Sequence, residues 1–305
     1  AAPWLAGLME PLFRVPGAGS AALVLGLVGG YPIGARTAAD LYRESLVSRE
    51  EALALYAAPL EELCSAARQI QLHFCQDRFD LCTIINGKSG RCPENCRFCA
   101  QSAFYSSCPE EYPLLDAETI VREAGRNHQQ GVLRFSIVTS GKRLDDAEVD
   151  RMCLAVRRIR KETGIHVCAS FGLLDQSQYE KLKEAGVTRI HNNLETSRNN
   201  FPNVCTSHTF DQKLAAIRAA QAAGLTVCSG GIVGMGETPE DQVDMALTLR
   251  ELGIRSVPVN MLNPIPGTPL GHLAPLTGDQ MRRIVAVFRF LLPDAFIRLA
   301  GGRGL

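Results

Sequence analysis

The fold class can be inferred from the stretch 132–171, which reads VLRFSIVTSGKRLDDAEVDRMCLAVRRIRKETGIHVCASF. This stretch contains one complete strand–helix–strand unit. The apolar runs Val132–Val138 and Ile165–Phe171 have the length and the β-branched content of buried strands. Between them, Asp145–Glu162 repeats apolar residues at helical spacing, and Gly164 follows as a typical helix end. Two buried strands joined by a helix predict a parallel pair.

The same alternation continues on both sides of this unit. Further strands are predicted over Phe79–Ile85, Val187–Leu194, Leu225–Gly231, Ile254–Leu262 and Ala295–Ala300. Further helices are predicted over Asp116–Gln129, Asp175–Ala185, Thr209–Ala223, Thr238–Leu252 and Thr277–Leu292. Strands that alternate with helices predict an α/β fold, and this spacing favours a TIM-type (β/α) barrel over a doubly wound sheet. The pattern stops after the seventh strand, so we expect the barrel to be open.

Two segments precede the barrel, which we place at residues 79–305. Residues 48–78 form a predicted N-terminal helical extension, which begins at a capping box from Ser48 to Glu51 and is divided by Pro59. Residues 1–47 are a separate apolar, Gly-rich segment. The stretch 15–35 has no charged residue and is long enough for a membrane span, but its Gly and Pro content fits a re-entrant or core segment equally well.

Composition narrows the class of function. The 32 Lys and Arg residues balance 32 Asp and Glu residues, which excludes the basic surface of a nucleic-acid-binding protein. Hydrophobic residues make up 46% of the chain, which excludes a disordered protein. The eleven cysteines are an odd number, and no secretory signal with a basic start is present. We therefore predict a cytoplasmic protein whose reduced thiols serve metal or redox chemistry.

Three cysteines lie close together after the first predicted strand. Cys92, Cys96 and Cys99 occur in GRCPENCRFCAQS with the spacing C-x3-C-x2-C, which favours an iron–sulfur cluster. Three protein ligands leave one iron of a four-iron cluster open to a small molecule. A structural zinc site needs a fourth ligand, and none lies nearby in the sequence because His73 and His128 are isolated. A thioredoxin-like C-x-x-C pair would leave one of the three cysteines unexplained.

This spacing in the first strand–helix loop resembles the radical S-adenosylmethionine (SAM) superfamily. Across residues 48–305 the chain resembles, more narrowly, the biotin synthase family of these enzymes. The motifs are CPENCRFCAQS, HNNLETS at 191–197, VCSGGIVGMGET at 227–238, SVPVNMLNPIPGTPL at 256–270 and IRLAGGRG at 297–304. The resemblance implies that the three loop cysteines hold a 4Fe-4S cluster and that SAM yields a radical. That radical activates dethiobiotin for sulfur insertion, with no catalytic residue beyond the clusters.

The same resemblance implies roles for single residues. Glu195 matches the acid that binds the SAM ribose, and Lys213 matches the basic partner of the SAM carboxylate. Asn193 and Asn260 match the pair that binds the ureido ring of dethiobiotin, since an amide offers both a donor and an acceptor. The remaining SAM positions are Phe98 beside adenine and the G-x-I-x-G-x-x-E segment of Gly230, Ile232, Gly234 and Glu237.

The resemblance also implies an auxiliary iron–sulfur cluster, 2Fe-2S or a variant, held by three Cys and one Arg. Cys168, Cys228 and Arg298 match three of these positions. The fourth is Ser136, whose neutral hydroxyl is a poor ligand for a soft site. Cys82 on the neighbouring strand stands where the family has a serine. We therefore predict that Cys82 joins Cys168 and Cys228, with Arg298 close by.

Further expectations concern partners and the two ends of the chain. The family suggests a homodimer and an electron donor such as flavodoxin or ferredoxin. Cys205, after the fourth strand, is a further candidate for the auxiliary cluster. Residues 1–47 are foreign to the family and resemble a gate-type segment of a sporulation membrane protein, so only they suggest a membrane. The family continues past Arg303, and we expect a fragment that lacks the barrel-closing end. Another radical SAM enzyme of this architecture, or an inactive iron–sulfur fragment, are the alternatives.

Overall fold

One parallel sheet organises the chain. The computed structural model describes residues 47–76, 82–107 and 109–300. Among these residues the sheet has eight strands in the order β1-β2-β3-β4-β5-β7-β6, with β8 also paired to β7. The strands are β1 (Cys82–Lys88), β2 (Arg134–Thr139), β3 (His166–Ser170), β4 (Val187–His191), β5 (Thr226–Cys228), β6 (Gly231–Val233), β7 (Ser256–Met261) and β8 (Phe296–Leu299).

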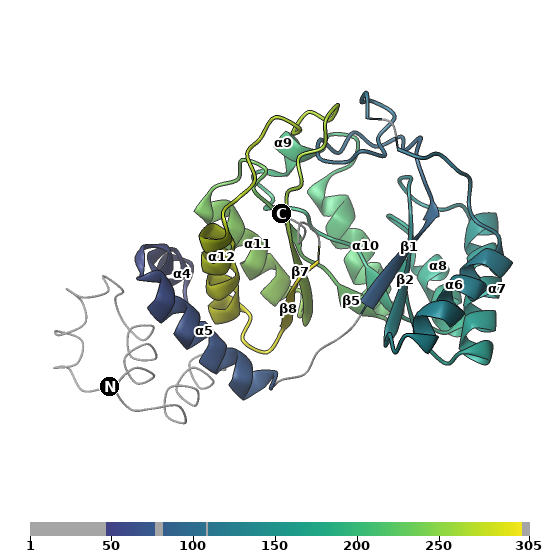
Figure 1. Cartoon of the computed structure of the whole chain (residues 1–305), viewed down its shortest axis with the longest axis horizontal. Helices are drawn as coiled ribbons and strands as arrows, with labels where there is room; N and C mark the ends of the chain where they lie inside the picture. Colours follow the sequence, from purple (N-terminus) through teal and green to yellow (C-terminus); the bar gives the residue numbers. More distant parts are fainter. Residues whose placement is uncertain (1–46, 77–81, 108, 301–305) are drawn as a thin grey trace.

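All strand pairs are parallel, and within the described residues β1 pairs with β2 and β8 with β7. The predicted strand-helix alternation is confirmed, and the sheet is an open barrel (Figure 1). The helices that follow the strands are α6 (Ala117–Gln129), α7 (Asp146–Glu162), α8 (Gln176–Ala185), α9 (Phe201–Val204), α10 (Phe210–Ala222), α11 (Pro239–Glu251) and α12 (Gly278–Leu291). The short α9 was not predicted.

Helix starts are set by local chemistry. Asp145, Asp175, Thr209, Thr238 and Thr277 each cap the helix that follows, through a side-chain oxygen that accepts a backbone N–H three residues on. In each case the third residue returns the bond, which completes a capping box and satisfies two terminal donors. These boxes place the amino ends of the helices just beyond the carboxyl ends of the strands.

The predicted fifth strand, Leu225–Gly231, is interrupted. β5 ends at Cys228 and β6 begins at Gly231, although both pieces pair with β7 in one continuous register. The N–H of Gly230 donates to the Asn193 side chain at 3.2 Å, and its carbonyl accepts from Glu195 N–H at 3.1 Å. The ladder breaks because the segment after β4 takes these hydrogen bonds. A Cβ on Gly230 would lie 1.9 Å from the Pro258 carbonyl oxygen, so this position needs glycine.

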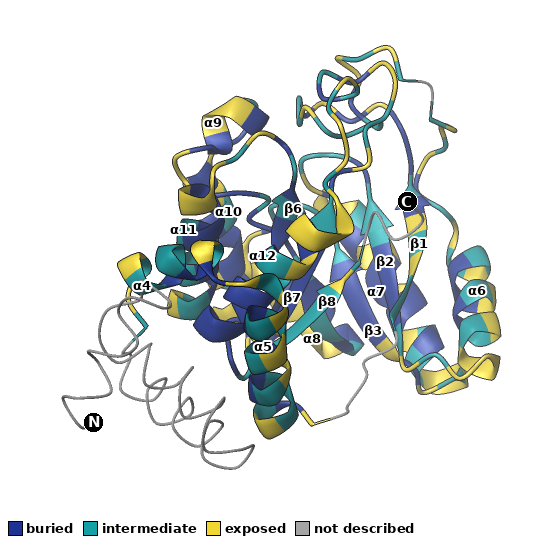
Figure 2. Cartoon of the chain, turned by 60° about the vertical axis from the view of Figure 1, so that its left-hand side comes forward, coloured by how far each residue is buried: buried dark blue, intermediate teal, exposed yellow. Residues whose placement is uncertain are grey.

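The N-terminal extension is part of the same packed body. It consists of α4 (Arg49–Ala54), a 3-10 turn η1 (Leu55–Ala57) and α5 (Leu60–Phe74), divided at Pro59 as predicted. Helix α5 packs on α12, and α4 packs on α11. Figure 2 shows the buried faces of α5 and α12 turned inward. Leu63 of α5 is fully buried and belongs to the main core cluster, so the extension shares that core.

Two expectations fall wholly or partly outside the described residues. The predicted apolar segment of residues 1–47 lies outside the described residues except for Val47, and the first part of the predicted strand at Phe79 precedes the described start of β1. Among the helices that the structure describes, none has the length and apolar character needed to cross a membrane.

Candidate functional site

The inner face of the sheet lines a cavity of about 610 Å³. Alternate residues of a strand face the same side, so each strand contributes every second side chain to the cavity wall. Examples are Cys82, Ile84 and Asn86 of β1, Arg134, Ser136 and Val138 of β2, and Arg189, His191 and Asn193 of β4 and its extension. The cavity therefore presents polar and thiol groups in a molecule whose core is otherwise apolar.

The three loop thiols, Cys92, Cys96 and Cys99, border the same cavity. Hydrogen bonds within the loop fold it over the end of β1, because Cys92 N–H donates to the Gln101 carbonyl at 2.9 Å and Cys99 N–H to the Cys96 carbonyl at 3.0 Å. The Gly141 N–H donates to the Cys92 sulfur at 3.3 Å. Three thiols on one loop, with a backbone donor to sulfur, fit an iron–sulfur cluster.

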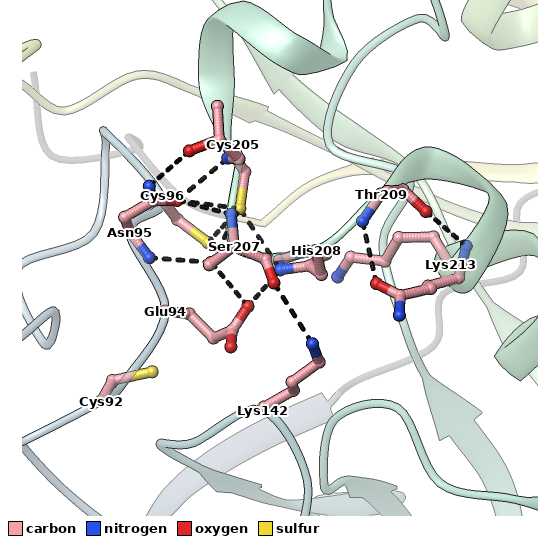
Figure 3. Close-up of polar contacts among 12 residues, drawn as sticks. Cys92, Glu94, Asn95, Cys96, Lys142, Cys205, Ser207, His208, Thr209 and Lys213 are labelled. Carbon is pink, nitrogen blue, oxygen red and sulfur yellow. Dashed lines mark hydrogen bonds and ion pairs between the residues drawn. The ribbon is translucent and has the colours of Figure 1, made fainter.

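A second group of ligand-type side chains lies against Cys96 (Figure 3). The Cys96 thiol is 3.7 Å from the Cys205 sulfur, and His208 Nδ1 is 3.2 Å from that same sulfur. His208 also forms a short contact with the Glu94 carboxylate. Cys205 therefore lies at the loop thiols, away from the strand-borne site for which it was a candidate. The zinc-type ligands that the sequence neighbourhood lacks come from a segment 109 residues away.

This pairing changes the acidity of both thiols. The Cys96 thiol donates to Cys205, and this bond together with His208 lowers the pKa of Cys205 to about 3 against the opposing effect of burial. The same bond, followed by burial, raises the pKa of Cys96. The first proton is therefore lost readily from the pair, and the second is held by Cys96.

The residues expected to bind SAM form one frame beside the loop thiols. Glu195 has a positive φ of 71° and bridges to Gly231, while Asn193 Nδ2 donates to a Glu195 carboxylate oxygen at 3.3 Å. Lys213 Nζ donates to the Asn192 side-chain oxygen at 3.3 Å. Glu195 and Lys213 both border the cavity that Cys96 borders.

Glu237 fixes the backbone of the 230–237 segment, called the Gly-rich segment from here on, and does not border the cavity among the described residues. Its carboxylate accepts the N–H groups of Gly234 and Met235 at 2.8 Å each, and also Gln242 Nε2 at 2.8 Å. Gln242 Oε1 in turn accepts the Tyr56 hydroxyl at 2.7 Å. A chain of hydrogen bonds thus connects the N-terminal extension with this segment.

An apolar group lies next to the Gly-rich segment. Phe98 and Ile232 pack against the buried cluster of Val204, Met235, Leu262 and Leu270. Phe98 also borders the cavity. Asn260 lies beside Ile232 in the sheet, and its amide donates to the Gly231 carbonyl at 3.2 Å. Unlike Asn193, Asn260 does not border the cavity among the described residues.

The strand thiols, Cys82, Cys168 and Cys228, line the same cavity from β1, β3 and β5. Burial raises the pKa of Cys168 to about 12, and the neighbouring Cys228 and Cys82 thiols add to this rise. Ser136 is buried and pairs in register with Cys168, whereas Cys82 is level with Arg134, two residues earlier on β2. The three predicted thiols and Ser136 therefore border one cavity, and the ligand set itself stays a prediction.

Cys228 lies beside a guanidinium and an imidazole. Arg298 Nη2 donates to the Cys228 sulfur at 3.0 Å, and Arg298 Nη1 donates to the Ser256 hydroxyl at 2.8 Å. His191 Nδ1 lies 3.4 Å from the same sulfur. Burial acts to raise the pKa of Cys228, but His191 and then Arg298 more than offset it, and the pKa falls to about 6. His191 was not predicted as a site residue, although it shares the alternating face of Asn193.

Comparisons with known proteins show which family the chain resembles. Residues 88–255 match the model of the radical SAM superfamily, and residues 258–305 match the biotin and thiamin synthesis associated domain. The biotin synthase of Brachyspira hyodysenteriae is 58% identical over 259 residues, which cover 85% of this chain and 78% of the relative. That of Akkermansia muciniphila is 59% identical over 256 residues, covering 84% and 80%.

The chain belongs to the biotin synthase family. It is therefore an enzyme of the radical SAM type, which uses a 4Fe-4S cluster and SAM. Among solved structures, methylornithine synthase aligns with a TM-score of 0.74 at 23% identity, covering 84% of this chain and 77% of the other. The hydrogenase maturase HydG aligns with a TM-score of 0.71 at 22% identity, covering 83% and 60%. These two likenesses show the shared fold alone.

Proposed function

We propose that this member of the biotin synthase family inserts sulfur into dethiobiotin to form biotin. One observation carries the proposal: two separate sets of three thiols, on a loop and on strands, border a single cavity. A radical SAM enzyme that only abstracts hydrogen needs the loop thiols alone. The strand thiols with Arg298 supply a second soft site facing the same space, as a sulfur donor requires.

The loop thiols would hold the SAM cluster. When bound, this 4Fe-4S cluster supplies the electron that splits SAM and so generates the hydrogen-abstracting radical. Glu195 offers two oxygens to the ribose hydroxyls, and Lys213 offers a positive charge to the SAM carboxylate. The adenine would lie against an apolar wall formed by Phe98 and the segment from Gly230 to Glu237, which includes Ile232 and Gly234. Backbone groups of this segment would be available to hydrogen-bond the adenine.

The substrate would lie between SAM and the strand thiols. Asn193 borders this space and offers an amide to the ureido ring. Asn260, the second predicted amide, pairs with Ile232 on β6 and does not itself border this space among the described residues. The strand thiols and Arg298 would hold the auxiliary cluster, 2Fe-2S or a variant, as the source of sulfur. Flavodoxin or ferredoxin would supply electrons, and the family suggests a homodimer.

Product analysis tests the proposed reaction. The chain is reconstituted anaerobically with iron and sulfide and then given SAM, a reductant and dethiobiotin. Mass spectrometry should detect both 5′-deoxyadenosine and biotin. Deoxyadenosine without biotin would refute the sulfur insertion and favour another radical SAM reaction. Iron-loaded protein that forms neither product would favour an inactive iron–sulfur fragment.

A matched pair of variants tests the second thiol set. Cys82→Ser should remove the auxiliary iron while the SAM cluster stays intact, since the loop thiols are unchanged. Cys153→Ser is the control, because Cys153 is a buried thiol of α7 that donates to a backbone carbonyl and does not border the cavity. The measurement is iron per chain together with the EPR signal of the reduced SAM cluster. Unchanged iron in Cys82→Ser would remove Cys82 from the ligand set.

A further inference from the structure

Three side chains that are typical metal ligands, those of Cys96, Cys205 and His208, lie together, and Glu94 contacts this group through His208. The ligand atoms of Cys96, Cys205 and His208 lie within 4.8 Å of one another, and the Glu94 carboxylate contacts Nδ1 of His208, the same nitrogen that faces Cys205. Cys205, His208 and Glu94 are only 4%, 7% and 6% exposed. The roles proposed above use neither Cys205 nor His208. Two thiols, an imidazole and a carboxylate in one buried place form a donor set suited to zinc.

The distances match a tetrahedral zinc site. Zinc–sulfur bonds of about 2.3 Å place two sulfur ligands of a regular tetrahedron ~3.8 Å apart, and the Cys96 and Cys205 sulfurs are 3.7 Å apart. A sulfur and a nitrogen ligand would be ~3.5 Å apart on the same basis, against 3.2 Å between Cys205 and His208 Nδ1. We propose that the cluster-free chain binds one zinc ion through Cys96, Cys205 and His208, with Glu94 as the fourth ligand.

The surroundings hold these ligands in place before any metal binds. The Asn95 side-chain oxygen accepts the N–H groups of Thr206 and Ser207 at 2.9 and 3.0 Å, which fastens the cysteine loop to the segment that carries Cys205. The imidazole of His208 packs edge-on against Phe201 with 5.5 Å between ring centres. Binding therefore needs little reordering of side chains, which favours a tight site.

The proposed zinc ion and the SAM cluster require the same thiolate. Cys96 is one of the three loop thiols, so zinc bound to Cys96 and Cys205 leaves only Cys92 and Cys99 for a 4Fe-4S cluster. Zinc occupancy would thus block cluster assembly, and zinc binding would displace the proton that the Cys96–Cys205 pair still holds. This exclusion, though not the zinc site itself, rests on the proposed function of Cys96.

A zinc titration of single-cysteine variants tests the site. The full chain is freed of iron under anaerobic conditions, and Zn²⁺ is titrated against a chromophoric chelator, with Co²⁺ as a spectroscopic probe. Cys205→Ser should weaken zinc binding at least ~100-fold and reduce the sulfur-to-cobalt charge-transfer band, because one of two thiolates is lost. Cys92→Ser and Cys99→Ser are the matched controls and should bind zinc like the wild-type chain. Circular dichroism confirms that each variant is folded.

Two results would overturn the proposal. Equal zinc affinity in the wild-type chain and Cys205→Ser would remove Cys205 from the site. A loss in Cys92→Ser and Cys99→Ser as large as in Cys205→Ser would place the zinc within the cysteine loop instead.

A second step addresses the competition between zinc and the cluster. Wild-type chain preloaded with zinc should take up less 4Fe-4S cluster, measured by EPR, and Cys205→Ser should escape this inhibition. Undiminished cluster assembly in the preloaded wild-type chain would overturn the exclusion. Failure of cluster assembly in every variant without zinc would count against the proposed function, while the zinc titration alone decides the zinc site.

Discussion

Replacement of Glu237 by glutamine isolates the contribution of one carboxylate to SAM binding. The two carboxylate oxygens accept three hydrogen bonds of 2.8 Å, from Gly234 N–H, Met235 N–H and Gln242. A glutamine retains one acceptor oxygen and places an NH₂ group at the other position. At least one backbone N–H then loses its acceptor, and it faces another donor.

The size of the effect follows from the charge. A hydrogen bond to a charged group contributes about 1.5–3 kcal/mol. If SAM must restore the order of this segment on binding, the same free energy weakens SAM binding by ~10-fold to ~150-fold, at about 1.4 kcal/mol per factor of ten. For a domain of this size the melting temperature should fall by roughly 3–12 °C.

The assay compares Glu237→Gln with Glu240→Gln under anaerobic conditions. Glu240 is an exposed acid in the first turn of α11, the helix that follows Glu237. Its substitution removes one negative charge without removing a hydrogen bond to the 230–237 segment. SAM affinity is measured by equilibrium dialysis of the reconstituted enzyme, and melting by circular dichroism. If both variants bind SAM as the wild type does, the segment does not serve the SAM site, whatever happens to the melting temperature.

Three further predictions follow from described contacts. Tyr56→Phe removes a neutral hydrogen bond worth about 0.5–1.5 kcal/mol from the chain that ends at the Gly-rich segment, so KM for SAM should rise ~2-fold to ~10-fold in steady-state kinetics; an unchanged KM would refute that link. Gly230→Ala places a Cβ 1.9 Å from the Pro258 carbonyl oxygen, so folded protein should be lost, as judged by circular dichroism. Burial raises the pKa of Asp241, but hydrogen bonds led by that from Ser197 more than offset it, so this pKa lies below its usual value. The resulting stability is present above the unfolded pKa of about 3.9 and is lost as pH falls through the folded pKa. Ser197→Ala should therefore make the melting temperature fall less steeply as the pH is lowered. An equally steep fall in the variant and the wild type would contradict this.

Local signals in the sequence predicted most of the fold. Helix starts were predictable because a capping box such as Thr209 with Gln212 lies within four residues. The break between β5 and β6 was not predicted, because it depends on Asn193 and Glu195, which follow the neighbouring strand. Its only trace in the sequence is the pair of glycines at 230 and 231.

For the site, too, local sequence signals were predictable and contacts between distant segments were not. The C-x3-C-x2-C spacing predicted the loop thiols as one set, since three ligands within eight residues need no knowledge of the fold. The contact between Cys205 and Cys96 spans 109 residues and depends on how two loops meet above the sheet. His191 could have been predicted from the sequence, because alternation along β4 places it on the same face as Asn193.

The double use of Asn193 has a consequence for the evolution of this enzyme. Its carbonyl oxygen holds the Gly230 N–H at the break in the sheet, while its NH₂ group reaches Glu195. If Asn193 binds the substrate as proposed, a mutation here that altered substrate choice would also release a backbone donor in the middle of the barrel. New specificities should therefore arise at other positions of the cavity wall, or at this one only together with a second change that supplies the missing acceptor.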